Sequence, residues 1–363
     1  MHSSQRGSLG FQRVLISYAI RLPDRPIAPD NAVMLALGIE TSCDETAVGI
    51  VEDGRRMLAN VVASQAAVHA QYGGVVPEVA SRHHIEAMIP VVKAALNEAG
   101  CTQRDLDCIA VTSGPGLAGA LLVGLNTAKA LAYAWEKPLL GINHLEGHIY
   151  ANWLEVDDPP ELPAVILIVS GGHSELVLAR GYGDYTLYGR TRDDAAGEAF
   201  DKAARVLGLG FPGGPAIERS ARESGPKPPR LPRAWLGDSN DFSFSGLKTA
   251  VARMAEESDA PVPDIAAGFQ TAVVDVLTKK AVRVAEETGA ACIMLSGGVA
   301  ANGPLREVMR ERSPVPVWVP RPVLCTDNGA MIAAAAHFRY ESGRAGLDLD
   351  VRASWPVAGT SNK

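Results

Sequence analysis

The chain repeats one arrangement of predicted elements, and this repetition constrains its fold more than any other feature. Each half opens with a strand, a turn of small polar residues and a second strand, at 35–53 and again at 164–181. Each half then continues with a strand, a glycine turn, a helix and another strand, at 108–143 and again at 292–320. A duplicated mixed α/β unit predicts two similar domains with a ligand-binding cleft between them.

The second half is the longer one, with extra residues around 182–260 that include the Pro- and basic-rich segment 224–235. At the other end of the chain, the segment before Met34 lacks the continuous apolar region of a secretory signal. A transit peptide is an alternative there. We expect four parts: a disordered extension or over-long start at 1–33, a first lobe at 34–145 completed by a helix at 326–342, a second lobe at 146–325, and a C-terminal tail at 343–363.

Composition narrows the class of protein. The 363 residues are 47% hydrophobic and 21% charged, as is typical of a globular protein, and no apolar run reaches the length of a membrane span. The net charge of −7 provides no global attraction to nucleic acid, so any RNA contact must use local patches or partner proteins. Five cysteines without a CxxC pair fit reduced thiols, and we therefore expect a cytoplasmic protein without membrane partners.

Three of the turns are suited to phosphate binding. They read ETSCDE at 40–45, VSGGH at 169–173 and SGGVAANG at 296–303. Backbone N–H groups in such turns point in one direction, and glycine lets phosphate oxygens approach closely. One glycine turn is ordinary, but three in duplicated halves predict a nucleotide, with its phosphates at the hairpin turns and its adenosine near 296–302.

His144 and His148 lie four residues apart, so a helix places both imidazoles on one face. This spacing suits two ligands of a Zn²⁺ or Fe²⁺ ion, although a chance pair on a polar face has the same spacing. A zincin protease needs Glu directly after the first His. Here Glu146 lies two positions after His144, on another side of the helix, and the inverted motif fails because residue 147 is Gly. The spacing therefore argues against a protease.

Eight motifs along the chain carry a resemblance to a known family. They are GIETSCDETAVGIV at 38–51, SGPGLAGALLVG at 113–124, NHLEGH at 143–148, VSGGHSELV at 169–177, GEAFDKAARVLGLGFPGGP at 197–215, FSFSGLKTAV at 242–251, SGGVAANGPLR at 296–306 and CTDNGAMIA at 325–333. From about Leu35 to Pro356 the chain resembles the universal tRNA N6-adenosine threonylcarbamoyltransferases, formerly described as O-sialoglycoprotein endopeptidases. This family lies within the actin, sugar-kinase and heat-shock-chaperone ATPase superfamily, which implies a duplicated actin-like ATPase fold with two similar lobes around a nucleotide cleft.

The resemblance implies transfer of the threonylcarbamoyl group from threonylcarbamoyl-AMP to the N6 amine of the adenosine next to the anticodon, in tRNAs that read codons starting with A. It also implies a smaller paralogous subunit and a small ATPase subunit as partners. An ATPase or kinase with the same fold, and a metalloendopeptidase, are the alternative functions. Neither alternative is favoured, because an ATPase does not need the metal ligands and the Glu of a protease is misplaced.

The resemblance also implies a third metal ligand, Asp327. On its own, Asp327 would be interpreted as the N-cap of the helix that follows. With His144 and His148 it would hold one divalent ion per subunit, iron as the first choice and zinc as the alternative. Two histidines and one carboxylate leave coordination positions open, as a catalytic ion requires.

Further residues follow from the motifs. Arg82, His83 and His84 are interpreted as interface or structure, and the basic residues Lys227, Arg230 and Arg233 as candidates for tRNA contact. The residues with implied substrate roles are Val169, Ser170, Gly171, Gly172 and His173 for the phosphate and threonylcarbamoyl group, Asp201, Gly214 and Glu218 for the ribose and neighbouring atoms, and Asn302 for the nucleotide, while Asp44 and Glu45 are the candidate catalytic acids.

Overall fold

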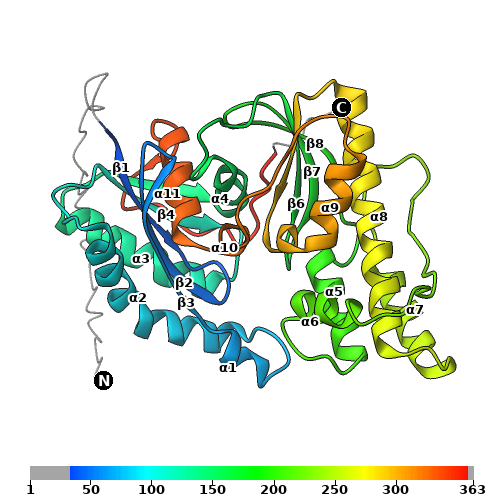
Figure 1. Cartoon of the computed structure of the whole chain (residues 1–363). Helices are drawn as coiled ribbons and strands as arrows, with labels where there is room; N and C mark the ends of the chain where they lie inside the picture. Colours follow the sequence, from blue (N-terminus) through cyan, green and yellow to red (C-terminus); the bar gives the residue numbers. More distant parts are fainter. Residues whose placement is uncertain (1–32, 359–363) are drawn as a thin grey trace, which may run out of the picture.

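The computed structural model describes residues 33–358, so the expected extension lies outside the described residues except for its last residue. Two β-sheets form the centre of the two lobes (Figure 1). The first sheet contains β1 (Leu35–Glu40), β2 (Glu45–Glu52), β3 (Arg56–Ser64), β4 (Cys108–Gly114), β5 (Leu139–Asn143) and β11 (Arg344–Ala345), and the second contains β6 (Ala164–Val169), β7 (Ser174–Gly181), β8 (Asp184–Arg190), β9 (Cys292–Ser296) and β10 (Val317–Trp318).

The two sheets share one topology over five strands, and the first sheet has β11 as an additional edge strand. The first has the order β11-β5-β4-β1-β2-β3, and the second has the order β10-β9-β6-β7-β8. In each, the first three strands in sequence pair antiparallel, and the next two extend the sheet in parallel from the first strand. The predicted duplication and the actin-like α/β fold class are confirmed.

The helices follow the same duplication. α2 and α8 both connect the third strand of a half to the fourth, and both begin with a proline in the first turn and end at a glycine with left-handed backbone, Gly100 or Gly289. The helices are α1 (Ala66–Ala70), α2 (Pro77–Ala99), α3 (Ala118–Ala134), α4 (His144–Tyr150), α5 (Ala196–Val206), α6 (Gly213–Ala221), α7 (Ser245–Glu257), α8 (Val262–Thr288), α9 (Gly303–Arg312), α10 (Pro322–Cys325) and α11 (Gly329–Phe338), with 3₁₀ turns η1 (Ala151–Trp153) and η2 (Gly298–Ala301).

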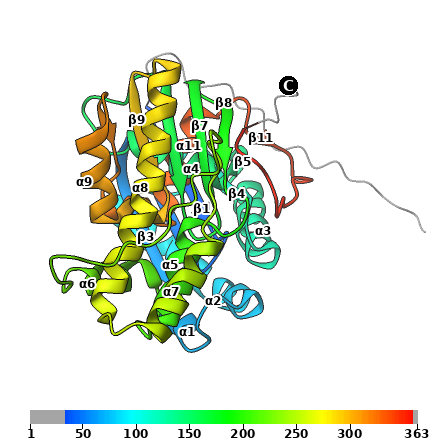
Figure 2. The same ribbon diagram turned by 90° about the vertical axis from the view of Figure 1, so that its right-hand side faces the viewer.

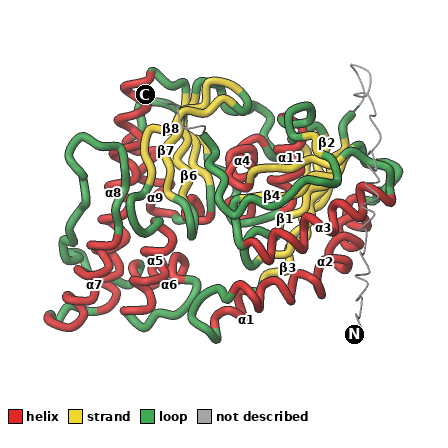
Figure 3. The backbone as a smooth tube through the Cα atoms, turned by 180° about the vertical axis from the view of Figure 1, so that it is seen from behind, coloured by secondary structure: helices red, strands yellow, loops and turns green. Residues whose placement is uncertain are grey.

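Three hydrophobic cores hold these layers together. α2 and α3 cover one face of the first sheet, whereas α5 to α9 cover the outer face of the second (Figures 1 and 2). The third core joins the lobes, because α4 and α11 pack between the two sheets (Figure 3). α4 includes residues on both sides of the boundary expected between 145 and 146, and the division of the chain at that point stays a prediction.

α11 lies directly on the first sheet although it comes almost 300 residues later. A Cβ atom added to Gly38 would lie 2.3 Å from the backbone N of Ala333, and one added to Gly49 would lie 2.2 Å from the N of Ala330. Only glycine permits this approach of helix to strand. The close packing fixes the residues just before α11 at the end of the sheet, beside α4.

A C-terminal strap, residues 343–355, closes the edge of the first sheet (Figure 2). Gly141 N donates to Gly343 O at 2.9 Å, and Arg352 N donates to Ser113 O at 2.7 Å. Trp355 O accepts a hydrogen bond of 3.1 Å from the side chain of Asn143. The strap thus reaches the residue that begins α4.

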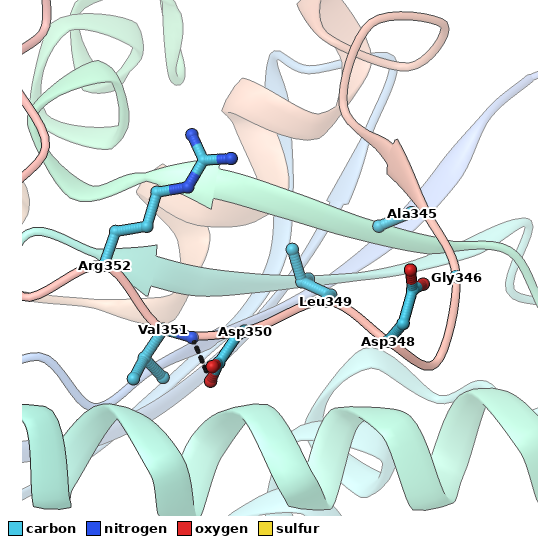
Figure 4. Close-up of a pocket in the computed structure, with 7 residues that line it drawn as sticks. All are labelled: Ala345, Gly346, Asp348, Leu349, Asp350, Val351 and Arg352. Carbon is cyan, nitrogen blue, oxygen red and sulfur yellow. Dashed lines mark hydrogen bonds between the residues drawn. The ribbon is translucent and has the colours of Figure 1, made fainter.

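The strap also lines a hollow of about 540 Å³ (Figure 4). Its lining comes from one surface segment, Ala345 to Arg352, and contains none of the predicted site residues. We therefore place the candidate site elsewhere. None of the helices between residues 33 and 358 combines the length and apolar content that crossing a membrane requires.

Candidate active site

His144, His148 and Asp327 come together where α4 meets the start of α11, and we call them the candidate metal group. The Nε2 atoms of His144 and His148 lie 3.6 and 3.2 Å from Oδ1 of Asp327. One potential ligand atom from each residue falls within 4.8 Å of the others. Both histidines are buried, so the group sits at the contact between the lobes.

Two asparagine caps place the group. Asn143 Oδ1 accepts a hydrogen bond from Leu145 N at 2.8 Å and begins α4, so the two histidines share one face of its first turns. Asn328 Oδ1 accepts from Met331 N at 3.0 Å and begins α11. The interpretation of Asp327 as the N-cap is therefore wrong, and its carboxylate is left to face the histidines.

A buried acid that the sequence analysis missed lies behind His144. Oε2 of Glu40 is 3.0 Å from Nδ1 of His144, and Thr112 Oγ1 donates to the same carboxylate oxygen at 2.5 Å. A proton on Nδ1 donated to Glu40 leaves the Nε2 lone pair directed at the candidate metal group. The signal in the sequence was an acid that ends the otherwise apolar strand LALGIE.

The residues present fit a divalent metal ion. His148 is only 1% exposed, and neither of its ring nitrogens forms a hydrogen bond of normal geometry within residues 33–358. Burying unpaired polar atoms costs free energy, which coordination to an ion would offset. Two imidazole nitrogens and a carboxylate oxygen form a donor set typical of iron and zinc sites with open positions.

The three residues of the group act on one another's charge. Burial opposes ionisation of Asp327, but His144 and His148 nevertheless lower its pKa to about 2. Burial also disfavours a charged His144, yet Glu40 and Asp327 raise the pKa of this histidine to about 9. Burial, His144 and His148 lower the pKa of His173 to about 4, so this predicted binding residue is a neutral imidazole.

Asp44 lies in the turn between β1 and β2, and Glu45 is the first residue of β2. Burial, Asp327 and Asp44 together raise the pKa of Glu45 to about 9, so its carboxyl carries a proton at neutral pH. Ser64 Oγ donates to Glu45 at 3.2 Å. The structure thus brings the two predicted acids near the candidate metal group, on the side of the first lobe.

The predicted turn at 169–173 is closed by its own backbone. Ser170 N donates to His173 O at 2.8 Å, and His173 N donates to Ser170 Oγ at 3.2 Å. Val169 is buried at the end of β6, whereas Gly171 and Gly172 are exposed and have open space where a side chain would project. The two glycines therefore offer backbone to a ligand.

The third glycine turn lies beside this one. A Cβ atom added to Gly297, which has a φ of +87°, would lie 2.5 Å from Val169 O. The start of α5 is attached to the same place, since Gly197 N donates to Ser170 O at 3.1 Å. Two of the three turns predicted to bind a nucleotide are therefore in contact.

The remaining predicted residues lie on helices of the second lobe or at their ends, where they form two hydrogen-bonded pairs. Asp201 Oδ1 accepts from Gly213 N at 2.7 Å, next to Gly214, whose Cβ position is open. Asn302 Nδ2 donates to Glu218 Oε2 at 3.2 Å. Asn302 also caps α9, so its role toward a nucleotide stays a prediction.

Two residues lie differently from expectation. His84 is fully buried, so of its two interpretations, interface or structure, only the structural one fits. Arg233 forms an ion pair with Asp275 at 2.7 Å and also binds the carbonyl of Leu231, which ties it to the second lobe. Lys227 and Arg230 are the exposed cations of the 224–235 segment.

A sequence model of one family matches residues 56–334, described as TsaD, tRNA N6-adenosine threonylcarbamoyltransferase. The chain belongs to the tRNA N6-adenosine threonylcarbamoyltransferase family. A curated member of this family from Thermomicrobium roseum is 57% identical over 354 residues, covering 89% of this chain and 97% of that protein. Another from Dehalococcoides mccartyi is 56% identical over 320 residues, covering 88% of this chain and 98% of that protein.

Solved structures with less than 20% identity to this chain share its fold. HypF from T. kodakarensis matches with a TM-score of 0.59 and 18% identity, over 87% of this chain and 49% of that one. Component A of the (R)-2-hydroxyglutaryl-CoA dehydratase from Acidaminococcus fermentans matches with a TM-score of 0.52 and 14% identity, over 85% and 99%. At these identities the likeness establishes the two-lobed actin-like fold alone.

Proposed function

We propose that this chain is a tRNA N6-adenosine threonylcarbamoyltransferase that moves the threonylcarbamoyl group from threonylcarbamoyl-AMP to the N6 amine of the adenosine next to the anticodon. Membership of the family supports the reaction. The observation that carries it to this chain is the buried His144–His148–Asp327 group, with Glu40 oriented behind His144. An ATPase of this fold has no need of such a group.

We propose that His144, His148 and Asp327 hold one Fe²⁺ ion, with Zn²⁺ as the alternative. The 2-His-1-carboxylate set is typical of non-haem iron, and the same donors occur in zinc sites. When bound, a divalent ion supplies Lewis acidity that polarises a carbonyl oxygen. Glu40 contributes by keeping the His144 tautomer that exposes Nε2.

The rest of the mechanism depends on positioning. In the transfer, the amine nitrogen bonds to the carbamoyl carbon, the bond from that carbon to the phosphate oxygen breaks, AMP departs with the bonding electrons, and the amine loses one proton. A mixed carbamoyl-phosphate anhydride is already activated, so the protein mainly aligns the amine and stabilises developing charge. The exposed amides of Gly171 and Gly172 are suited to the departing phosphate.

The other predicted residues have supporting positions. His173 stays neutral beside the candidate metal group and can donate or accept a hydrogen bond there. Glu45, protonated at neutral pH, can donate a hydrogen bond to an anionic substrate oxygen. We propose direct transfer to the amine, without an acyl-enzyme.

The peptidase alternative is not favoured. Glu146, the only acid between the two histidines, is buried with its carboxylate 3.5 Å from Nε of Arg339. It therefore faces away from the candidate metal group. A metalloprotease needs a carboxylate beside the metal-bound water, and this Glu cannot supply it.

We also propose cytoplasmic partners: a smaller paralogous subunit, a small ATPase subunit and tRNA. The helices α2 and α3 lie together and carry three exposed apolar side chains: Ile85 is 65% exposed, Ile89 48% and Leu122 41%. These side chains support docking of the paralogue on this face. Lys227 and Arg230 support contact with tRNA phosphates. With a net charge of −7, the chain alone is expected to attract tRNA weakly.

The test is reconstituted transfer. The purified chain, loaded with Fe²⁺ or Zn²⁺, is given threonylcarbamoyl-AMP and unmodified tRNA, with and without the partners, and the nucleosides are analysed by mass spectrometry. We expect threonylcarbamoyladenosine with the partners and little without them. No product under any of these conditions, together with steady ATP hydrolysis, would favour the ATPase alternative.

A further inference from the structure

A network of buried polar side chains lies behind residues 41–45, which we call the acid turn. This network takes no part in the chemistry described so far. It contains Thr46, Gln65, His69 and His84, which are all between 0 and 5% exposed. His84 Nε2 lies 3.0 Å from Cys43 O, and His84 Nδ1 lies 2.8 Å from Thr46 Oγ1. The network connects α2 to Cys43, the residue just before the two candidate acids.

The contacts of this network assign the tautomers of His84 and His69. A carbonyl oxygen only accepts, so His84 must carry its proton on Nε2 and use Nδ1 as the acceptor for Thr46. His69 Nδ1 accepts from Val76 N at 3.3 Å, so its proton is on Nε2, which donates to Gln65 Oε1 at 3.2 Å. These roles give one consistent network of hydrogen bonds.

The acid turn is held by three successive carbonyl groups. Ser42 O accepts from Leu117 N at 2.8 Å, and Asp44 O accepts from Gln65 N at 3.1 Å. The Cys43 carbonyl between them is the one that His84 binds. In a planar trans peptide the C=O of one residue points opposite to the N–H of the next. Binding the Cys43 carbonyl therefore aims the Asp44 N–H away from His84.

We propose that His84 is a positioning residue. It holds the Cys43–Asp44 peptide so that the Asp44 amide and the two acids face the substrate. The direction of the Asp44 amide follows from the anchored carbonyl, and Asp44 and Glu45 are the two residues that directly follow Cys43 in the chain. The consequence for transfer rests on the proposed function, because it requires a substrate in front of this turn.

The other end of the network, at His69, is connected to the second lobe. Val76 and Gly74 bind His69 through their N–H groups and hold the loop after α1. From α5, Arg205 donates a hydrogen bond to Gly73 O in that loop. Figures 1 and 3 show this loop reaching toward α5 and α6. The acid turn and the contact between the lobes are therefore linked by one set of hydrogen bonds.

The test uses three substitutions and one matched control in the full chain. His84→Leu removes both contacts, whereas His84→Gln keeps an amide nitrogen that can donate to Cys43 O. Thr46→Val removes only the donor to Nδ1. Thr278→Val is the control, because Thr278 is equally buried and its hydroxyl has no hydrogen-bond partner among the described residues.

Two readouts separate positioning from function. Hydrogen–deuterium exchange of the segment 40–46 measures how well the turn is held, independently of the reaction. The kcat for transfer measures what the position of the turn contributes to catalysis. For His84→Leu we expect exchange to rise on the order of tenfold and kcat to fall roughly 10- to 100-fold, with metal content kept. His84→Gln should recover most of both, Thr46→Val should show a smaller loss, and Thr278→Val should match wild type.

Each result decides the question. If exchange at 40–46 is unchanged in His84→Leu, the positioning role is wrong. If exchange rises and kcat stays at the wild-type value, the turn moves without consequence and the role in transfer is wrong. If His84→Leu does not fold, the comparison of His84→Gln and Thr46→Val with Thr278→Val carries the same test. Absent transfer by the wild-type protein contradicts the proposed function and leaves the exchange result standing.

Discussion

Glu40 and His144 form a buried pair in which a carboxylate oxygen lies 3.0 Å from the ring nitrogen Nδ1. Glu40 is fully buried, and despite burial the His144 charge lowers its pKa, so the carboxyl is ionised. The pair comes from the first strand of the chain and from α4, more than 100 residues later. It orients the first of the three candidate metal ligands.

The substitution Glu40→Gln should weaken metal binding without abolishing it. The amide no longer attracts the Nδ1 proton as a charge, so His144 is a poorer and less ordered ligand, and we expect a loss of roughly 10- to 100-fold in affinity. Competition with a chelator of known affinity measures it. Glu52→Gln, in a surface pair with Arg56, is the control. Equal affinity in wild type and Glu40→Gln contradicts the prediction.

Removing a ligand should have a larger effect. His144→Ala or Asp327→Ala leaves two of three protein ligands, and we expect loss of bound metal and of most transfer activity in a protein that still folds. Elemental analysis, circular dichroism and the transfer assay check this, with His83→Ala expected to keep its metal. Transfer near the wild-type rate by metal-free His144→Ala protein would refute the metal assignment.

We expect no peptidase activity on casein or glycoprotein. The reason is the ion pair of Glu146 with Arg339, which removes the acid that a metalloprotease mechanism needs. Incubation of highly purified protein with labelled substrates, with and without chelator, is the measurement. Cleavage that a chelator stops and that His148→Ala abolishes would overturn the expectation.

Acidification should weaken the fold partly through His84. Burial lowers its pKa from the usual 6.5, although the Cys43 carbonyl and the facing acids Glu40 and Asp44 oppose that shift, and His69 adds to it. Between the lowered value and 6.5 the unfolded chain binds more protons, so stability falls as pH falls through this window. Urea unfolding at about pH 7.5 and about pH 5.5 should show a smaller loss for His84→Gln than for wild type. An identical loss contradicts the prediction, and His83→Gln serves as the surface control.

The C-terminal strap should support the candidate metal group from outside. Ending the chain after Val351 removes the hydrogen bond from Asn143 to Trp355 O and the bond from Arg352 N to Ser113 O. Because Asn143 caps α4, we expect a loss of about 1 kcal/mol of stability and weaker metal binding. Denaturation and metal competition measure both. A chain ending after Ala358 is the control, and wild-type metal affinity in the shorter chain contradicts the role.

The sequence allowed the duplicated fold and the three metal candidates to be predicted, because turns and motifs are local patterns. Glu40 was missed because an acid that ends a strand also occurs at exposed sheet ends, and only the fold brings it to His144. The inward direction of His84 depends on the rotation of α2 about its axis, which the neighbouring Arg82 and His83 do not reveal. The pairing of Arg233 with Asp275 crosses 42 residues and has no sequence signal.

The packing of α11 on β1 and β2 has a consequence for how the chain is made. The first lobe contains the earliest strands to leave the ribosome, yet its covering helix and the candidate ligand Asp327 are synthesised near the end. Domains usually fold as units during synthesis, N-terminal first, but this lobe cannot be completed in that order. Its sheet therefore stays without this covering helix through most of translation, and an ion at the candidate metal group could be loaded only into a chain that is nearly finished.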